Sequence, residues 1–192
     1  MNIEYEATFL NIDKDDIRRR LKKVKAKLTK PEFLQKRLAY SLPKGHEVEG
    51  GWLRIRDEGE KITMSYKMVD GDKIENQKEI CLEINDFNLA DKFLRGIGCK
   101  KKAYQETKRE LWLLDNVEIT IDEWPFLEPL VEVEGVNETD VKKVSERLGF
   151  NYDTAYFGSI DTIYSKKYKI SKEQINCYTP EITFKSNNPF IK

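Results

Sequence analysis

The stretch that decides the fold lies at the start of the chain and reads Ile3-Glu4-Tyr5-Glu6-Ala7-Thr8-Phe9. Apolar side chains occupy its odd positions, and polar side chains occupy its even positions. Successive side chains of a β-strand point to opposite faces, so this period of two predicts a strand with one apolar and one charged face. Glu4 and Glu6 share the charged face, where a pair of carboxylates can bind a hard cation.

The same alternation recurs along the chain and predicts seven further strands. The turn Asp57-Glu58-Gly59-Glu60 joins two of them as a hairpin. The seven segments are residues 35–42, 52–57, 62–68, 78–84, about 101–114, 117–122 and 129–135. The sequence therefore predicts eight strands in total.

Three helices interrupt these strands. Asp13 is the expected N-cap of a helix that runs to about residue 27, with Ile17, Leu21, Val24 and Leu28 on its apolar face. Asp86 and Asn137 are the expected N-caps of two more helices, which end at Gly98 and Gly149. The last 40 residues are expected to form one or two short helices near residues 159–176, followed by a tail.

The composition limits the class of protein. Among 192 residues, 34 basic side chains balance 34 acidic ones, so a strongly basic nucleic-acid-binding protein is not indicated. The apolar runs are too short to span a bilayer. Cys81, Cys99 and Cys177 are isolated from one another and predict reduced thiols in a cytoplasmic protein.

Two architectures fit strands with one apolar and one charged face. In a closed barrel the helices cover the apolar outer faces, and the charged faces point into the lumen. In a sandwich the apolar faces form the core, and the charged faces point to water. The alternation alone leaves both open.

Basic residues and a second acidic pair occupy the polar positions of the later strands. Glu132 and Glu134 repeat the pattern of the first pair, and a basic set lies between the two pairs: Arg54, Arg56, Lys67 and Arg109. Arginine binds phosphate oxygens through its planar fork, and carboxylates bind Mg²⁺. Together these residues predict a site for a metal-bound polyphosphate.

Several motifs, in the same order and spacing, resemble those of the CYTH domain over about residues 2–167. This is the triphosphate tunnel metalloenzyme superfamily, which includes class IV adenylyl cyclases, thiamine triphosphatases and inorganic tripolyphosphatases. Glu4-x-Glu6 resembles the acidic signature of the first strand, and Leu53-Arg54-Ile55-Arg56 resembles the basic motif that follows. The remaining motifs are Lys67, then Lys108-Arg109 with Trp112, then Asp122, and finally Glu132-Val133-Glu134.

The resemblance implies an α+β fold, a closed eight-stranded antiparallel β-barrel or tunnel with helices outside. It implies Mg²⁺ or Mn²⁺ held by Glu4, Glu6, Asp122, Glu132 and Glu134, with Glu6, Glu132 and Glu134 as catalytic residues. It implies substrate contacts from Arg54, Arg56, Lys67, Arg109 and Arg37. The tunnel domain is expected over residues 1–170, and a C-terminal tail over 171–192.

The chain departs from the family pattern in one short segment, where Pro125-Phe126-Leu127-Glu128-Pro129 replaces the usual Leu-Gly-x-Phe before the second acidic pair, and at three single positions. Thr8 stands where the first signature has lysine, Thr107 stands where the basic-aromatic strand has lysine, and Arg37 stands where aspartate is frequent. Three functions remain open: hydrolysis of a triphosphate such as tripolyphosphate, ATP or thiamine triphosphate; a class IV adenylyl cyclase; or a weakly catalytic polyphosphate- or nucleotide-binding protein. The resemblance is compatible with a homodimer and indicates neither a nucleic-acid nor a membrane partner.

Overall fold

The computed structural model describes residues 1–191 and contains one ten-stranded sheet. Its strands are β1 (Asn2–Ile3), β2 (Tyr5–Phe9), β3 (Lys27–Ser41), β4 (Gly51–Asp57), β5 (Ile62–Val69), β6 (Gln77–Ile84), β7 (Lys100–Leu114), β8 (Val117–Glu123), β9 (Leu130–Gly135) and β10 (Glu181–Ile182). The spatial order is β1-β6-β5-β4-β3-β7-β8-β9-β2, and every neighbouring pair along this path is antiparallel. β10 joins β7 in parallel.

The first predicted strand forms both edges of the sheet. Its β1 half pairs with β6, and its β2 half pairs with β9. At the junction, the Glu4 backbone N–H donates to the Gln77 carbonyl at 2.8 Å, and Gln77 Nε2 donates to the Glu6 carbonyl at 2.8 Å. The sheet thereby closes into a nearly complete barrel. All eight predicted strands are present, the first in two halves, and the barrel is confirmed over the sandwich.

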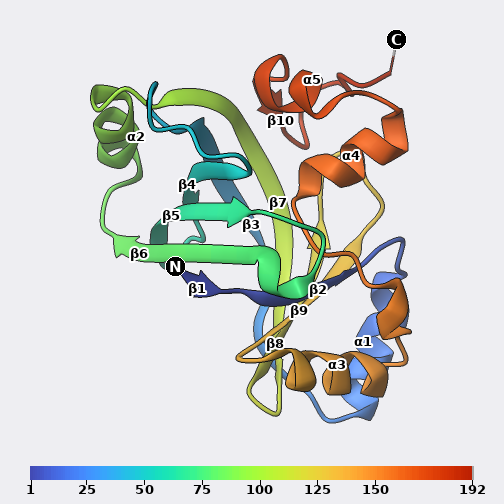
Figure 1. Cartoon of the computed structure of the whole chain (residues 1–192). Helices are drawn as coiled ribbons and strands as arrows, with labels where there is room; N and C mark the ends of the chain where they lie inside the picture. The colour runs from blue at the N-terminus through green and yellow to red at the C-terminus, as the bar shows by residue number, and fades with distance from the viewer. Residues whose placement is uncertain (192) are drawn as a thin grey trace.

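The helices cover the outside of this barrel (Figure 1). They are α1 (Lys14–Lys23), α2 (Phe87–Gly96), α3 (Glu138–Arg147), α4 (Ile160–Tyr168) and α5 (Lys172–Cys177), with short 3₁₀ turns η1 (Ile74–Asn76) and η2 (Tyr152–Thr154). As predicted, the side chains of Asp13, Asp86 and Asn137 cap α1, α2 and α3 by accepting backbone N–H groups three residues on. No helix within residues 1–191 is both long enough and apolar enough to cross a membrane.

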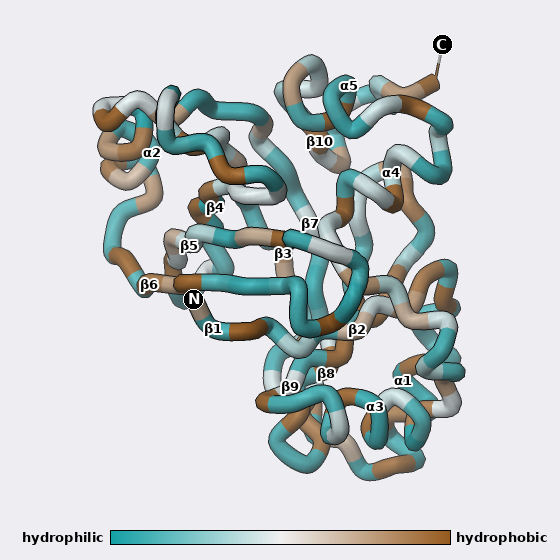
Figure 2. The backbone as a smooth tube through the Cα atoms, viewed as in Figure 1, coloured by the Kyte–Doolittle hydropathy of each residue, from teal (hydrophilic) through white to brown (hydrophobic). Residues whose placement is uncertain are grey.

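Apolar residues of the strands face the helices. Hydrophobic and hydrophilic segments alternate along α1 and α3 (Figure 2), and both helices bury apolar side chains in a cluster that contains residues of β8 and β9. Leu21 and Val144 belong to the same cluster of buried residues as Ile119 and Val133. Each such side chain contributes about 1.5–3 kcal/mol through removal from water. The outward apolar faces therefore leave the polar faces for the barrel interior.

The first helix is shorter than the sequence indicated. α1 ends at Lys23, and Lys25 adopts a left-handed conformation with φ of 62°, which stops the helix. Leu28 therefore does not lie on the helix but on β3, where 43% of it is exposed. β3 begins at Lys27 rather than at residue 35, and its pairing with β7 is irregular between Leu28 and Phe33.

The C-terminal segment, residues 160–191, packs on one side of the barrel. Buried Tyr164, Ile175 and Ile182 form a third apolar cluster with Trp124 and Leu130. In Figure 1 this segment lies beside the upper half of β7, away from α1 and α3. The barrel surface is therefore covered in three regions: one beneath α1 and α3, one beneath α2, and one beneath this C-terminal segment.

Candidate functional site

One wall of the barrel interior is basic. Arg54 and Arg56 are two residues apart on β4, and Arg37 of β3 lies directly opposite Arg56. Residues paired across antiparallel strands project to the same face, so the three guanidinium groups share the interior. Arg37 and Arg54 are buried, and Arg56 is nearly so.

The facing wall is acidic. Glu6 of β2 pairs with Glu134 of β9, and Glu134 pairs in turn with Glu118 of β8. Thr8 pairs in the same way with Glu132. Like charges placed opposite each other across strands are destabilising, so this row of carboxylates needs a counter-charge.

Arg109 links the two walls. Its Nε donates to the two carboxylate oxygens of Asp122 at 2.8 and 3.1 Å, and its Nη2 donates to Glu132 at 2.5 Å. Asp122 is 0% exposed. Although burial opposes it, the charges of Asp122 and Glu132 hold the pKa of Arg109 well above its usual range. This buried triad keeps Arg109 cationic in the centre of the interior.

Lys67 forms a second link at the junction of β1 and β2. Its Nζ donates to Glu4 at 2.8 Å and lies 3.8 Å from Glu79, which also accepts from Arg54 at 3.0 Å. Burial raises the pKa of Glu4 to about 7, against the charge of Lys67 and with a further contribution from Glu79. Although burial opposes it, the hydrogen bond with Glu4 and the charge of Lys67 lower the pKa of Glu79 to about 2, so Glu4 keeps its proton to a higher pH than Glu79 does.

The carboxylates of Glu6 and Glu134 are left without counter-charges. Within residues 1–191 neither one forms an ion pair. Burial, and then the charge of Glu132, hold the pKa of Glu6 well above its usual range. Burial likewise raises the pKa of Glu134, with Glu118 adding to the effect. A divalent cation would stabilise both as carboxylates, so the donor set fits a hard metal ion.

The carboxylates predicted to bind metal are not gathered around one point. Among residues 1–191, no three acidic, histidine or cysteine side chains are grouped as a ready cation site. Two of the predicted ligands, Asp122 and Glu132, are engaged by Arg109, and Glu4 is engaged by Lys67. A cation that binds these carboxylates would therefore have to displace Arg109 and Lys67 from them.

Arg37 has a different environment from the other interior arginines. Its Nη2 donates to Thr107 Oγ1 at 2.5 Å and to Gln35 Oε1 at 3.0 Å, both neutral groups. Its guanidinium carbon lies 4.3 Å from the centre of the Trp124 ring. Burial, and then the charges of Arg54 and Arg56, hold the pKa of Arg37 well below its usual range. Within residues 1–191, Arg37 is therefore a buried basic side chain without an anionic partner.

Of the five buried side-chain atoms within residues 1–191 that lack hydrogen-bond partners, three are donors on β3 and β4, the two strands of the basic wall. They are Gln35 Nε2, Arg37 Nε and Arg54 Nε. A buried donor without a partner costs about 1–3 kcal/mol, so such groups are retained where a ligand satisfies them. Phosphate oxygens would accept from all three.

The structure places all ten predicted site residues on the interior face, in the two walls and their links. Sequence reasoning missed Gln35, Thr107 as a partner of Arg37, and Trp124. The signal for Trp124 was present, because it continues the inward alternation of Glu118, Thr120 and Asp122 on β8.

The family follows from a match that covers most of the chain. Residues 2–159 match the CYTH domain. The chain belongs to the CYTH family. Membership implies an enzyme with a divalent metal cation and a triphosphate substrate.

Individual proteins resemble the chain at low sequence identity. A protein of Methanocaldococcus jannaschii, provisionally named an adenylate cyclase, is 28% identical over 151 residues, which cover 76% of this chain and 85% of that protein. A Vibrio parahaemolyticus structure, also provisionally named an adenylate cyclase, aligns with a TM-score of 0.74 at 12% identity, covering 85% and 98% of the two chains. A Hippeastrum adenylyl cyclase homologue, described as having a dominant triphosphatase activity, aligns with a TM-score of 0.59 at 13% identity, covering 88% and 97%. These two alignments show that this chain shares its fold with each solved chain over nearly the whole length of that chain.

Proposed function

We propose that the protein hydrolyses inorganic or organic triphosphates inside the barrel, with the help of a divalent metal. The observation that carries this proposal is the set of unpartnered donors on the basic wall, Gln35 Nε2, Arg37 Nε and Arg54 Nε. They face a carboxylate row in which, among residues 1–191, Glu6 and Glu134 form no ion pair. An anion would accept hydrogen bonds from the basic wall, and a cation would neutralise the carboxylates. A metal–triphosphate complex supplies the anion and the cation together.

The basic side chains position the phosphate chain. Phosphoryl transfer depends mainly on position and on stabilisation of the charge that spreads over the phosphoryl oxygens. Arg54 and Arg56 present two guanidinium groups on one strand, and each can bind two oxygens. Lys67 and Arg109 add positive charge from other strands. No side-chain nucleophile is needed, because water attacks the phosphorus.

The acidic side chains hold the metal, which we propose to be Mg²⁺ or Mn²⁺. Its ligands are drawn from Glu4, Glu6, Asp122, Glu132 and Glu134. When bound, the ion neutralises phosphate oxygens and lowers the pKa of a water molecule. Glu6, Glu132 and Glu134 are the proposed catalytic carboxylates: they would orient the attacking water, and one of them would accept its proton. We place this activity in the cytoplasm, in line with the reduced cysteines.

The second candidate is an adenylyl cyclase. The same walls would bind ATP, and the ribose 3′-oxygen would attack the α-phosphorus with release of pyrophosphate. The names of the Methanocaldococcus and Vibrio relatives favour this reaction, whereas the triphosphatase activity described for the Hippeastrum relative favours hydrolysis. A protein that binds triphosphates without turnover is the third candidate.

Product analysis separates these candidates. The protein is incubated with Mg²⁺ or Mn²⁺ and with tripolyphosphate, ATP or thiamine triphosphate, and the products are resolved by chromatography. Orthophosphate supports hydrolysis, and cyclic AMP with pyrophosphate supports the cyclase. Arg56→Ala should lose the activity, whereas Arg95→Ala should keep it, because Arg95 lies on α2, outside the barrel interior, and pairs with Asp91. Absence of all products with every substrate would refute an enzymatic role.

A further inference from the structure

Arg37 is the one interior arginine among the described residues that has no carboxylate partner. Arg54 pairs with Glu79, Arg56 with Glu58, and Arg109 with Asp122 and Glu132. Arg37 is 6% exposed and donates only to the neutral oxygens of Gln35 and Thr107. A buried charge without a counter-charge is costly, so this position favours a ligand that brings its own negative charge.

Trp124 packs against Arg37 at the end of β8. It is the residue after β8, it is 4% exposed, and its ring lies against the Arg37 guanidinium. β8 pairs with β7 only from Lys108 onward, so residues 100–107 of β7 have no β8 neighbour. The loop that begins at Trp124 therefore starts at the point where the pairing of β8 with β7 ends.

The C-terminal segment, residues 160–191, holds this loop in place. Tyr164 donates its hydroxyl to the Pro125 carbonyl at 2.7 Å, and Tyr168 donates its hydroxyl to the Phe126 carbonyl at 2.5 Å. β10 pairs with β7 at Tyr104 and Gln105, and Gln105 is the β7 residue opposite Arg37. The family match ends at residue 159, so this support lies outside the matched domain.

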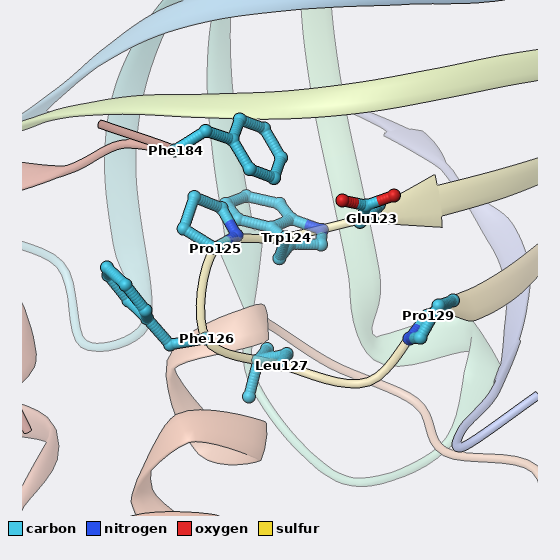
Figure 3. A pocket seen from close by; sticks show the side chains of 7 residues that line it. All are labelled: Glu123, Trp124, Pro125, Phe126, Leu127, Pro129 and Phe184. Atoms are coloured by element: carbon cyan, nitrogen blue, oxygen red, sulfur yellow. The ribbon is translucent and has the colours of Figure 1, made fainter. Parts of the chain in front are cut away.

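The outer side of the loop is apolar and adds no phosphate-binding group. Figure 3 shows Trp124, Pro125, Phe126 and Leu127 around a pocket of about 380 Å³, with Phe184 of the C-terminal segment beside them. Glu123 is the only charged residue of that lining. The lining of this pocket therefore offers no cationic side chain to a phosphate chain that continues beyond Trp124.

We infer that Arg37 binds the terminal phosphoryl group of the substrate and that Trp124, supported by residues 160–191, closes the interior behind it. This inference rests on the proposed triphosphate site and names its substrate class. The substrate must carry at least one uncapped terminal phosphate. Tripolyphosphate and nucleoside triphosphates qualify, whereas triphosphates esterified at both ends do not.

The charge of the ligand supports this assignment. A terminal phosphoryl group carries about two negative charges at neutral pH, whereas one esterified at both sides carries one. The terminal group also exposes three oxygens, which match the Arg37 guanidinium and the free Gln35 Nε2 donor. A capping nucleoside would instead meet the Trp124 ring at the point where the oxygens should bind.

Calorimetric titration of wild type in EDTA, where turnover is prevented, tests the charge argument. The probes are ATP, with one free end, and diadenosine triphosphate, with none. We expect ATP to bind at least about tenfold more tightly, equivalent to about 1.4 kcal/mol. Arg37→Gln should weaken the binding of ATP by about the same factor, and it should change the affinity for diadenosine triphosphate less than about threefold. Equal affinity of wild type for the two probes, or an equal loss for both in Arg37→Gln, would overturn the inference.

A second pair of variants tests closure by Trp124. Trp124→Ala should bring the two affinities closer together, because the space behind Arg37 opens. Trp124→Phe keeps an aromatic ring there and should preserve the discrimination. Melting curves establish that both variants fold, and Trp124→Leu replaces the alanine variant where it does not. An unchanged ratio in a folded alanine or leucine variant would refute closure by Trp124.

The proposed function and this inference fail in different ways. If Arg37-dependent discrimination is present but no metal supports turnover, the enzymatic proposal fails and the inference stands. If triphosphates are turned over but the capped and uncapped probes bind alike, the inference alone fails.

Discussion

Replacing Glu6 by glutamine should stabilise the metal-free protein. Glu6 lies opposite Glu134, which lies opposite Glu118, and burial together with Glu132 holds the pKa of Glu6 well above its usual range. A carboxyl group whose pKa is higher in the folded than in the unfolded state stabilises folding at low pH and loses that contribution as the pH rises through the folded value. Glutamine keeps the shape of the side chain and never ionises.

The size of this effect follows from the cross-strand contact. Opposed charged side chains on neighbouring strands change stability by about 0.2–1 kcal/mol each, so we expect a gain of about 1 kcal/mol for Glu6→Gln at pH 8. In a protein of this length that gain raises Tm by about 2–4 °C. The gain should shrink as the pH is lowered, because Glu6 of the wild type then becomes neutral as well.

The same substitution should have the opposite consequence when metal is present. A cation at a hundred times its Kd stabilises the wild type by about 2.7 kcal/mol. Glutamine has no negative charge to offer, so the metal-dependent rise in Tm should be smaller in Glu6→Gln. Metal-dependent turnover should be lost while the fold remains.

Thermal unfolding followed by circular dichroism measures both effects, in EDTA and in MgCl₂ at pH 8. Glu83→Gln is the matched control, because Glu83 is exposed near the end of β6 and pairs across the sheet with Thr63. It should behave as wild type in both buffers. A lower Tm of Glu6→Gln in EDTA, or a metal-dependent shift equal to that of wild type, would refute the reasoning.

Three further predictions concern other parts of the barrel. Thr8→Lys adds a cation opposite Glu132 and should tighten tripolyphosphate binding about tenfold in calorimetric titrations; unchanged or weaker affinity would contradict a role for position 8 in phosphate binding. Asp122→Asn leaves Arg109 short of its bidentate partner and should lower the free energy of unfolding in urea by about 3–5 kcal/mol, so a loss below about 1 kcal/mol would show that the pair is not buried as described. Leu21→Ala should cost about 2–5 kcal/mol in the same assay, with exposed Leu89→Ala within about 0.5 kcal/mol of wild type, and equal losses would argue against the α1 packing.

The strands were predictable because their burial has a period of two that short-range sequence displays. The end of α1 was not, because an apolar residue at position 28 continues the helical pattern whether or not the chain does. What stops the helix is the left-handed backbone of Lys25, a lysine that carries no turn signal of its own. The early part of β3 contains Pro31 and irregular pairing, which removed the alternation on which recognition of a strand depends.

The residues of the candidate site were predictable as a set, but their pairings were not. Sequence spacing shows which side chains share a face of one strand, whereas the partners of Arg109 depend on how β7, β8 and β9 are aligned. The same alignment leaves Arg37 without a carboxylate. Trp124 was missed because an aromatic residue at the end of a strand is most often part of an apolar core, and here it serves that core and also contacts Arg37.

The way in which the first nine residues join both edges of the sheet has a consequence for the order of folding. Glu6 pairs with Glu134, so this seam cannot form until most of the chain is available, although its N-terminal half is synthesised first. Joining partners so far apart in sequence is slow relative to forming local hairpins such as β4–β5. Because the same seam brings Glu4 and Glu6 to the other acidic residues, completion of the barrel and assembly of the acidic wall are a single event. A cation that binds this wall would therefore also stabilise the seam between β2 and β9, and its removal would weaken that seam.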